Sequence, residues 1–234
     1  DALRTPGRRP GGCLRRAEIA ALVALAAAVG AVALRIALGP VTAALPTPLG
    51  PIALVRLDWV SVSMLALVAF VGWVVLRYAR VYLDGEDGQG AFTGWLCSTL
   101  AMVLLLVQAG HLVIFAAAWI GTSLCLHHLL LFYPKRAAAV RGARKKFVVA
   151  RAGDAAVLVA FGLLFWWFGT GDIAALNAAA AAGAGSGVIV VAAGGLAVAA
   201  LLKSAQFPTH GWLTEVMETP TPVSALLHAG VVNA

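Results

Sequence analysis

The chain has 234 residues, of which 62% are hydrophobic and 12% charged, and its formal net charge at pH 7 is +7. Soluble domains carry about 25% charged residues, so a soluble fold of this length lacks the polar surface it would need. The three cysteines form no CxxC pair and no paired framework, which disfavours a disulfide scaffold and a zinc ribbon. The composition therefore indicates a membrane protein.

The sequence begins at Asp1, not at a methionine, and stops within the apolar run GVVNA, so we expect a piece of a longer protein. The first stretch, RTPGRRPGGCLRR, is typical of a basic loop. It does not resemble a signal peptide, because the apolar run that follows is too long for an h-region. We therefore expect a basic cytoplasmic segment over residues 1–16 and a transmembrane domain over residues 17–234.

A spanning helix needs about 20 mainly apolar residues. The sequence predicts six complete spans and a seventh, partial one, at about 17–38, 58–77, 91–109, 111–132, 147–169, 186–206 and 222–234. The stretch AAAAAGAGSG (178–187) lacks the preceding strand and the following GK[ST] of a phosphate loop, so it is interpreted as a turn between helices. The expected fold class is all-α, a polytopic transmembrane helical bundle.

Lysine and arginine fall on alternate segments between the predicted spans. Five precede the first span, two follow the second and seven lie within 133–151, whereas the opposite side has Arg35 and Arg56. Because basic loops stay in the cytoplasm, we expect the N-terminal end and segment 204–221 on the cytoplasmic side. The basic run 135–146 is interpreted as a topology signal that faces anionic lipid, in preference to a nucleic-acid site.

Lys203 lies within a predicted span. An ammonium group at the centre of a bilayer costs about 2.5–3.5 kcal/mol on insertion scales, so such a residue usually has a function. The alternative is a side chain that snorkels from a helix end.

Prolines interrupt the sequence after Lys203. Pro208 removes a backbone donor and is expected to end or kink the helix, while Pro220 and Pro222 suit the first turn of the next segment. Broken helices at membrane depth line cavities and often build ion sites. We therefore expect Lys203 and His228, on either side of the break, to face one hydrated cavity and pass protons.

His210, Glu215 and Glu218 lie between Lys203 and His228, and the break would place them along the same ion path. A solvated cytoplasmic loop is the equally supported alternative for the two glutamates.

Other polar residues carry weaker signals. Cys125 and His128 share a helix face, but two ligands are too few for a metal site. Arg151 and Asp154 have the i,i+3 spacing of an ion pair, and Asp58 is placed to complement the start of the second span. The sequence contains no Ser-His-Asp arrangement, paired carboxylates or dinucleotide fingerprint. We expect no catalytic residue, metal or cofactor in this chain.

The stretch KSAQFPTHGWLTEVMETPTPVSALLHAG (203–230) resembles the signature of the antiporter-like membrane subunits of respiratory complex I and Mrp antiporters. AVRGARKKFVVARAGDAAVL (139–158) resembles a second element of that family, and the likeness covers most of residues 50–234. The resemblance implies a discontinuous helix along a proton or cation path. It assigns Lys203 to the membrane lysine that exchanges protons and His228 to the histidine that relays them.

Ile120 departs from this pattern. In the complex I type a glutamate of a G-W-E-G motif pairs with the lysine, and Ile120 stands at the matching position. Without that carboxylate Lys203 needs another partner or is neutral more often. The lost glutamate and the ending TEVMETPTPVSALLHAGVVNA resemble the membrane subunits of bacterial inorganic carbon pumps. That resemblance implies an inner-membrane location and a large carbonic-anhydrase-like partner that binds the zinc.

Three functions remain open at this point. The first is a subunit that conducts protons or sodium ions to drive uptake of CO2 or bicarbonate. The second is a proton-translocating subunit of complex I, of a membrane hydrogenase or of an Mrp antiporter, against which Ile120 counts. The third is a membrane anchor that docks a partner and conducts nothing, in which case substitutions at Lys203 and His228 would be silent.

Overall fold

The computed structural model describes residues 10–47, 50–215 and 219–228. In this part of the chain six helices are long and apolar enough to span a membrane. They are α1 (Gly11–Leu38), α2 (Trp59–Tyr82), α3 (Gln89–Val107), α4 (Leu112–Leu130), α5 (Ala137–Phe168) and α7 (Ser186–Lys203). The shorter elements are β1 (Val41–Thr47), β2 (Gly50–Leu57), α6 (Ile173–Ala181), α8 (Gly211–Glu215) and α9 (Thr221–Leu226). The predicted fold class, a polytopic all-α membrane bundle, is confirmed.

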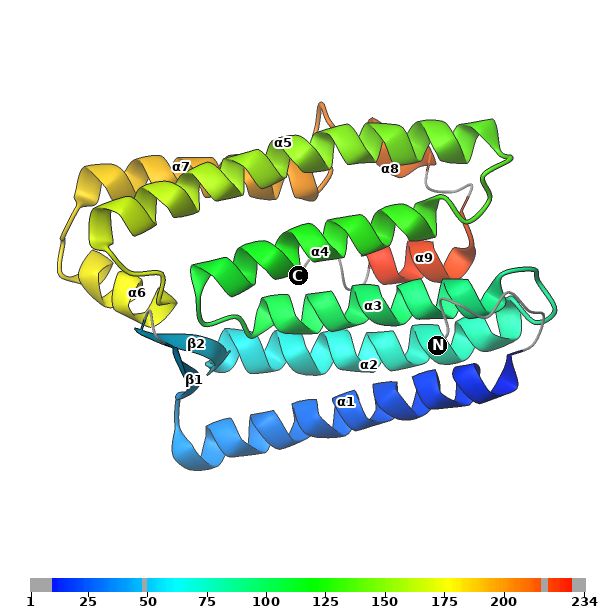
Figure 1. The fold of residues 1–234 in the computed structure, drawn as a ribbon, viewed down its shortest axis with the longest axis horizontal. Helices are drawn as coiled ribbons and strands as arrows, with labels where there is room; N and C mark the ends of the chain where they lie inside the picture. The colour runs from blue at the N-terminus through cyan, green and yellow to red at the C-terminus, as the bar shows by residue number, and fades with distance from the viewer. Residues whose placement is uncertain (1–9, 48–49, 216–218, 229–234) are drawn as a thin grey trace.

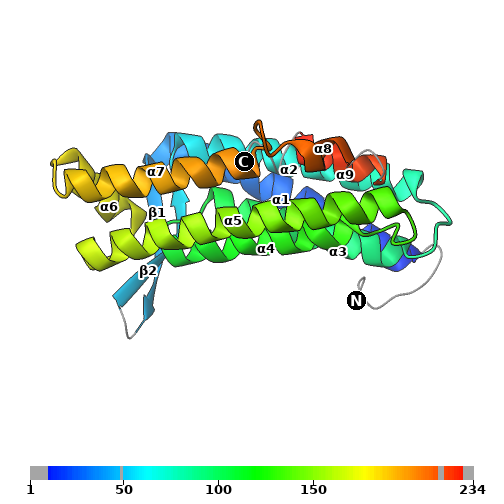
Figure 2. The same ribbon diagram turned by 90° about the horizontal axis from the view of Figure 1, so that it is seen from above.

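The long helices lie side by side in chain order, α1 to α5, and α7 runs along α5 (Figures 1 and 2). Short connections join α2 to α3, α3 to α4 and α4 to α5, so these neighbours run antiparallel. The last two short helices fold back onto the bundle, since α8 packs against α5 and α9 packs against α2.

Two clusters of buried apolar side chains hold the bundle together. The larger joins α2, α3, α4 and α9 and includes Leu76, Leu96, Leu129 and Leu226. The smaller joins α4, α5, α6 and α7 and includes Leu112, Val157, Phe161, Leu176 and Ala199. Each buried side chain of this size contributes about 1.5–3 kcal/mol where it leaves water, although helices that associate within lipid rely more on close packing.

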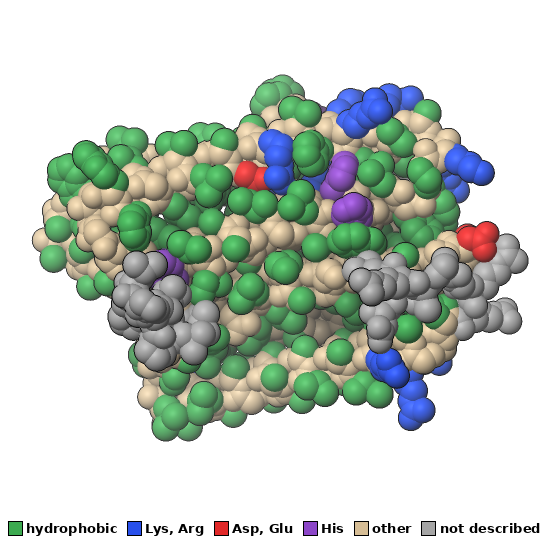
Figure 3. Space-filling model, viewed as in Figure 1, with side chains coloured by type: hydrophobic (Ala, Val, Ile, Leu, Met, Phe, Trp, Pro, Cys, Tyr) green, Lys and Arg blue, Asp and Glu red, His purple; other side chains and the backbone are tan. Residues whose placement is uncertain are grey.

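The outer surface of the bundle is also apolar. Val23 and Ile36 on α1, Val159 on α5 and Val190 on α7 are exposed. Figure 3 shows hydrophobic side chains over most of one face, with Lys and Arg gathered mainly at the end where α1 and α5 begin. A helix with an apolar outer face is typical of a membrane span, so the chain is a multi-pass membrane protein.

The helix bounds differ from the predicted ones at two basic segments. α1 begins at Gly11, so Arg15 and Arg16 of the predicted segment 1–16 are helical. α5 begins at Ala137 instead of 147, so most of the basic run 135–146 forms its first turns. Alanine, arginine and lysine are strong helix formers, whereas hydropathy marks only where a helix enters the apolar layer.

Two elements lie between predicted spans. β1 and β2 form an antiparallel hairpin in which Val41 pairs with Leu57. α6 covers part of the small-residue stretch 178–187, and the Asp172 carboxylate caps it by accepting a hydrogen bond from Ala175 N at 2.8 Å. These segments are too short to span a bilayer, so a search for long apolar runs does not find them.

Asp58 caps α2, as its position in the sequence predicts. Its carboxylate accepts a hydrogen bond from Ser61 N at 2.7 Å and lies 3.1 Å from Arg56 Nε. Burial opposes ionisation of this carboxyl, but the hydrogen bonds from Ser61 and the Arg56 guanidinium outweigh it and lower the pKa of Asp58. Asp58 is therefore ionised at neutral pH, where a negative charge stabilises a helix N-terminus.

The chain breaks after α7. The helix ends at Lys203, Ala205 has a φ of +52°, and Pro208 lies in the turn before α8. Pro220 precedes α9 and Pro222 lies in its first turn, where its missing N–H leaves no hydrogen bond unmade. α9 ends at Leu226, and the remainder of the span predicted over 222–234 lies largely outside the described residues.

Candidate functional site

The ammonium group of Lys203 faces α4. Its Nζ lies 3.7 Å from the centroid of the Trp119 ring and donates a hydrogen bond of 3.4 Å to Trp119 O. A cation over a desolvated indole face is stabilised by about 2 kcal/mol. An ammonium has three N–H donors, and the single hydrogen bond found within the described residues is long. Lys203 therefore has donors available for water or another polar group.

Small residues bring α7 close to α5. A Cβ added at Gly153 would lie 3.7 Å from Ala199 O and 3.7 Å from Leu202 Cβ, and one added at Gly195 would lie 3.3 Å from Ala160 Cβ. Such small-residue contacts allow membrane helices to approach closely. The approach at Gly153 places the end of α7, and thus Lys203, beside the middle of α5.

A small cavity of about 30 Å³ lies next to Lys203. Its polar lining residues are Thr122 and Ser123 from α4, Lys146 and Asp154 from α5, and Lys203. Trp212 from α8 and Leu227, which follows α9, also line it, so the broken segment covers the cavity. A water molecule needs about 10–15 Å³ of such space, so the cavity has room for about two waters among polar partners.

Lys146 is a member of this site that the sequence reasoning missed, because it was counted with the basic run 135–146. It is only 6% exposed, and its Nζ donates to Ser123 O at 2.6 Å and to Ser123 Oγ at 3.0 Å. The spacing along α5 could have revealed it. The cavity-lining residues of that helix are Lys146, Val149, Ala150, Gly153 and Asp154, at i, i+3, i+4, i+7 and i+8.

Arg151 and Asp154 form the ion pair that their spacing predicts, with Arg151 Nη2 2.7 Å from Asp154 Oδ2. Asp154 is 5% exposed, and its Oδ1 has no hydrogen-bond partner among the described residues. Arg151 Nη2 also donates to Ser123 Oγ at 3.3 Å. Asp154 therefore lines the same cavity as Lys203, and Arg151 joins this site through its contacts with Asp154 and Ser123.

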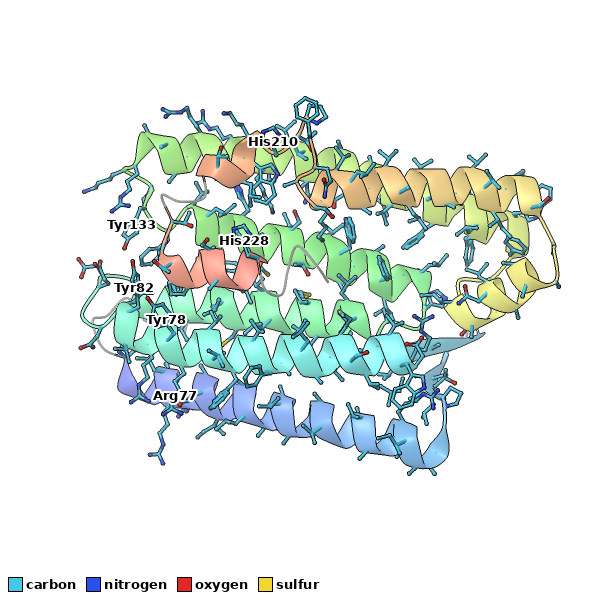
Figure 4. All side chains as sticks on the ribbon, turned by 180° about the vertical axis from the view of Figure 1, so that it is seen from behind. Arg77, Tyr78, Tyr82, Tyr133, His210 and His228 are labelled. Atoms are coloured by element: carbon cyan, nitrogen blue, oxygen red, sulfur yellow. The ribbon has the colours of Figure 1, made fainter. Side chains whose placement is uncertain are left out.

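The other predicted ion-path residues lie outside the cavity. Figure 4 shows His228 at the end of α9 and His210 beside α8. Both side chains are exposed, neither lines the cavity, and the His210 ring stacks on Phe207 with centroids 5.7 Å apart. The Glu215 side chain and Glu218 lie outside the described residues. Lys203, Lys146 and Asp154 thus line one cavity, and His228 is not among the described residues that line it.

A second cavity, of about 440 Å³, is also lined by Trp119. Its lining is mostly apolar but includes Arg56, Ser61 and Asn177. Trp119 lines both this cavity and the smaller one at Lys203.

Residues 109–234 match the family described as "NADH:quinone oxidoreductase/Mrp antiporter, TM". Residues 53–93 match the N-terminal family of complex I chain 5. The chain is 42% identical, over 75% of its length and 35% of the relative, to the "Probable inorganic carbon transporter subunit DabB" of Hydrogenovibrio crunogenus. It is 38% identical, over 75% of its length and 29% of the relative, to NADH-quinone oxidoreductase subunit L of Pseudomonas aeruginosa.

The solved structure of the Mrp complex from Dietzia sp. is similar as well. It superposes on 94% of this chain and 26% of its own chain, with a TM-score of 0.79 and 28% sequence identity. The chain spans about a third of the length of the curated relatives it matches.

Proposed function

Because this chain belongs to the membrane-subunit family shared by NADH:quinone oxidoreductases and Mrp antiporters, we propose that it forms an ion-conducting part of an antiporter-like subunit. The observation that carries this proposal is the position of Lys203. Its ammonium group lies at the broken end of a span, over Trp119, and lines a small cavity with Asp154 and Lys146. Ionisable groups inside a bilayer are costly and are typical of ion pathways.

The two cavities supply a route for the ion. Arg56, Asn177 and Trp119 line the larger cavity, and Trp119, Lys203 and Trp212 line the smaller one. Non-helical backbone at membrane depth is stable where it lines such a cavity. Movement of the Trp119 ring would join the two cavities, and Lys203 would take up or release a proton at the junction.

Two features favour an inorganic carbon pump over the respiratory alternatives. The first is the similarity to the DabB protein of Hydrogenovibrio crunogenus, and the second is Ile120 in place of the glutamate of complex I subunits. In this proposal the subunit lies in a bacterial inner membrane and conducts protons or sodium ions down their gradient. A DabA-like, carbonic-anhydrase-like partner, which would bind the zinc, converts that flow into uptake of CO2 or bicarbonate.

Purification of the complete native subunit in a mild detergent tests the identity of the partner. We expect mass spectrometry to find one large zinc-containing soluble protein. A set of small membrane subunits and iron–sulfur proteins would overturn the carbon-pump assignment and favour complex I, a membrane hydrogenase or an Mrp antiporter.

Lys203→Met tests conduction in a host that needs the pump for growth at ambient CO2. We expect loss of growth in air, restored growth at high CO2 and unchanged assembly with the partner. The matched control is Lys145→Met, which replaces an exposed lysine of α5. Normal growth of Lys203→Met in air would show that Lys203 conducts nothing, as a simple membrane anchor requires.

A further inference from the structure

Lys146 is buried without a carboxylate of its own among the described residues. Its hydrogen bonds go to Ser123 O and Ser123 Oγ, and the nearby carboxylate of Asp154 is already in contact with Arg151. A buried ammonium that lacks an opposite charge costs several kcal/mol. A neutral amine could also donate a hydrogen bond to Ser123, so the hydrogen bonds do not require Lys146 to be protonated. The site therefore favours a lysine that alternates between the ammonium and the neutral amine.

The charges around the cavity support this interpretation. Lys146, Arg151 and Lys203 are three basic groups, and Asp154 is the carboxylate among the lining residues that the structure describes. Arginine keeps its proton in proteins, so only the two lysines can give one up. The other titratable groups facing Lys146 are Cys125 and His127 on α4, and neither supplies a negative charge at neutral pH. The surroundings therefore favour the state in which one of the two lysines is protonated over the state in which both are.

Lys146 lies near the basic end of α5, which the positive-inside rule assigns to the cytoplasmic side. α5 has 32 residues and is about 48 Å long, whereas the hydrocarbon core of a bilayer is about 30 Å thick. Lys146 lies about 33 Å from Phe168 along the helix axis, so a core that ends near Phe168 has its other edge near Lys146. The Lys146 side chain nevertheless points inward, into the cavity that Lys203 also lines.

From this geometry we propose that Lys146 is a second proton-binding residue of the ion path, which accepts a proton from Lys203 through the shared cavity and releases it toward the cytoplasm. The inference rests on the proposed function and applies when the conducted ion is the proton. In this inference Lys146, and not His228, accepts the proton from Lys203, and the proton path stays within α4, α5 and α7.

The transfer is balanced in protons and charge. An N–H bond of the Lys203 ammonium breaks, a cavity water carries the proton, and a new N–H bond forms at the lone pair of the neutral Lys146 amine. Ser123 can hold Lys146 in both states, because its hydroxyl donates to the neutral amine and accepts from the ammonium. Ser123 O accepts from Nζ throughout, which keeps the side chain aimed at the cavity.

Proton flux in vesicles that contain the complete native complex tests this role. A pH-sensitive dye reports uptake after a pH gradient is imposed, and we compare wild type, Lys146→Met, Lys146→Arg, Lys145→Met and Lys203→Met. A positioned proton-transfer group contributes about 100-fold or more in rate, so we expect flux to fall about 100-fold in Lys146→Met and Lys146→Arg. Lys145→Met, at the exposed neighbouring position, should conduct like wild type.

Lys146→Arg separates proton transfer from structure, because arginine preserves the charge and the donors to Ser123 but cannot release a proton. Wild-type flux in Lys146→Arg or in Lys146→Met would overturn the inference. If Lys203→Met stopped the flux while the Lys146 variants conducted normally, the proposed function would stand and only this inference would fail. Sodium flux without proton flux in the wild type would also overturn it.

Discussion

Asp154→Asn should destabilise the site by removing the carboxylate that balances Arg151. The distance between Arg151 Nη2 and Asp154 Oδ2 is 2.7 Å, and the side chains are 34% and 7% exposed, respectively. Breaking a buried pair by removing one partner costs about 3–5 kcal/mol. Because the guanidinium is one-third exposed, solvent screens part of the interaction, and we expect a loss of about 2–3 kcal/mol.

A double-mutant cycle measures this interaction directly. The free energy of unfolding of the detergent-solubilised subunit is compared in wild type, Asp154→Asn, Arg151→Met and the double variant. We expect the double variant to lose about 1–2 kcal/mol less than the sum of the single losses, because residues in contact are coupled. Strictly additive losses would show that the two side chains do not stabilise each other, and would refute the assignment of Asp154 as the counter-charge of the site.

Two further predictions concern helix α2, namely its N-terminal cap and its packing against α3. Asp58→Ala removes the cap of α2 and should cost about 1 kcal/mol at neutral pH. Since the fold lowers the pKa of Asp58, this stabilisation is present at neutral pH and is lost as the pH falls through that lowered pKa, so thermal melts of wild type and variant should converge in acid. Gly72→Ala would place a Cβ 2.6 Å from Leu100 Cδ2, between α2 and α3, and overpacking of this kind costs about 1–3 kcal/mol. Gly194→Ala, whose added Cβ meets no atom within 4 Å, is the matched control, and equal melting temperatures of the two variants would contradict the expected clash.

The arrangement around Lys203 bears on how this chain differs from the complex I subunits it resembles. The motif of the complex I subunits that this sequence resembles has a glutamate at the position of Ile120, which lies on α4. In the structure the carboxylate of the cavity comes from α5, as Asp154, and a second lysine faces the same cavity. A site with an excess of positive charge favours release of a proton over its retention.

The sequence by itself determined the fold class and the place of the break. Each spanning helix contains a long apolar run that the sequence shows, because a bilayer admits only apolar segments whose backbone polar groups are satisfied within the helix. Pro208 and Lys203 identify the discontinuous segment from the sequence. A proline breaks the helix that contains it, and a charge within a span is costly whichever helix packs against it. The Asp58 cap and the Arg151–Asp154 pair are also local, and the sequence predicts both.

The tertiary structure alone decided which polar residues meet. Lys146 belongs to a run of basic residues that resembles any cytoplasmic loop, and only the helical start of α5 at Ala137 turns this lysine toward Ser123. His228 follows the break in sequence, yet its exposed side chain does not line the cavity. Hydropathy predicts which segments lie in the lipid. The rotation of a helix about its axis and the helices that it contacts depend instead on packing between helices, such as the close approach at Gly153. For that reason the sequence predicts Lys203 as an ion-path residue, whereas the side chains that surround it follow only from the packing of the helices.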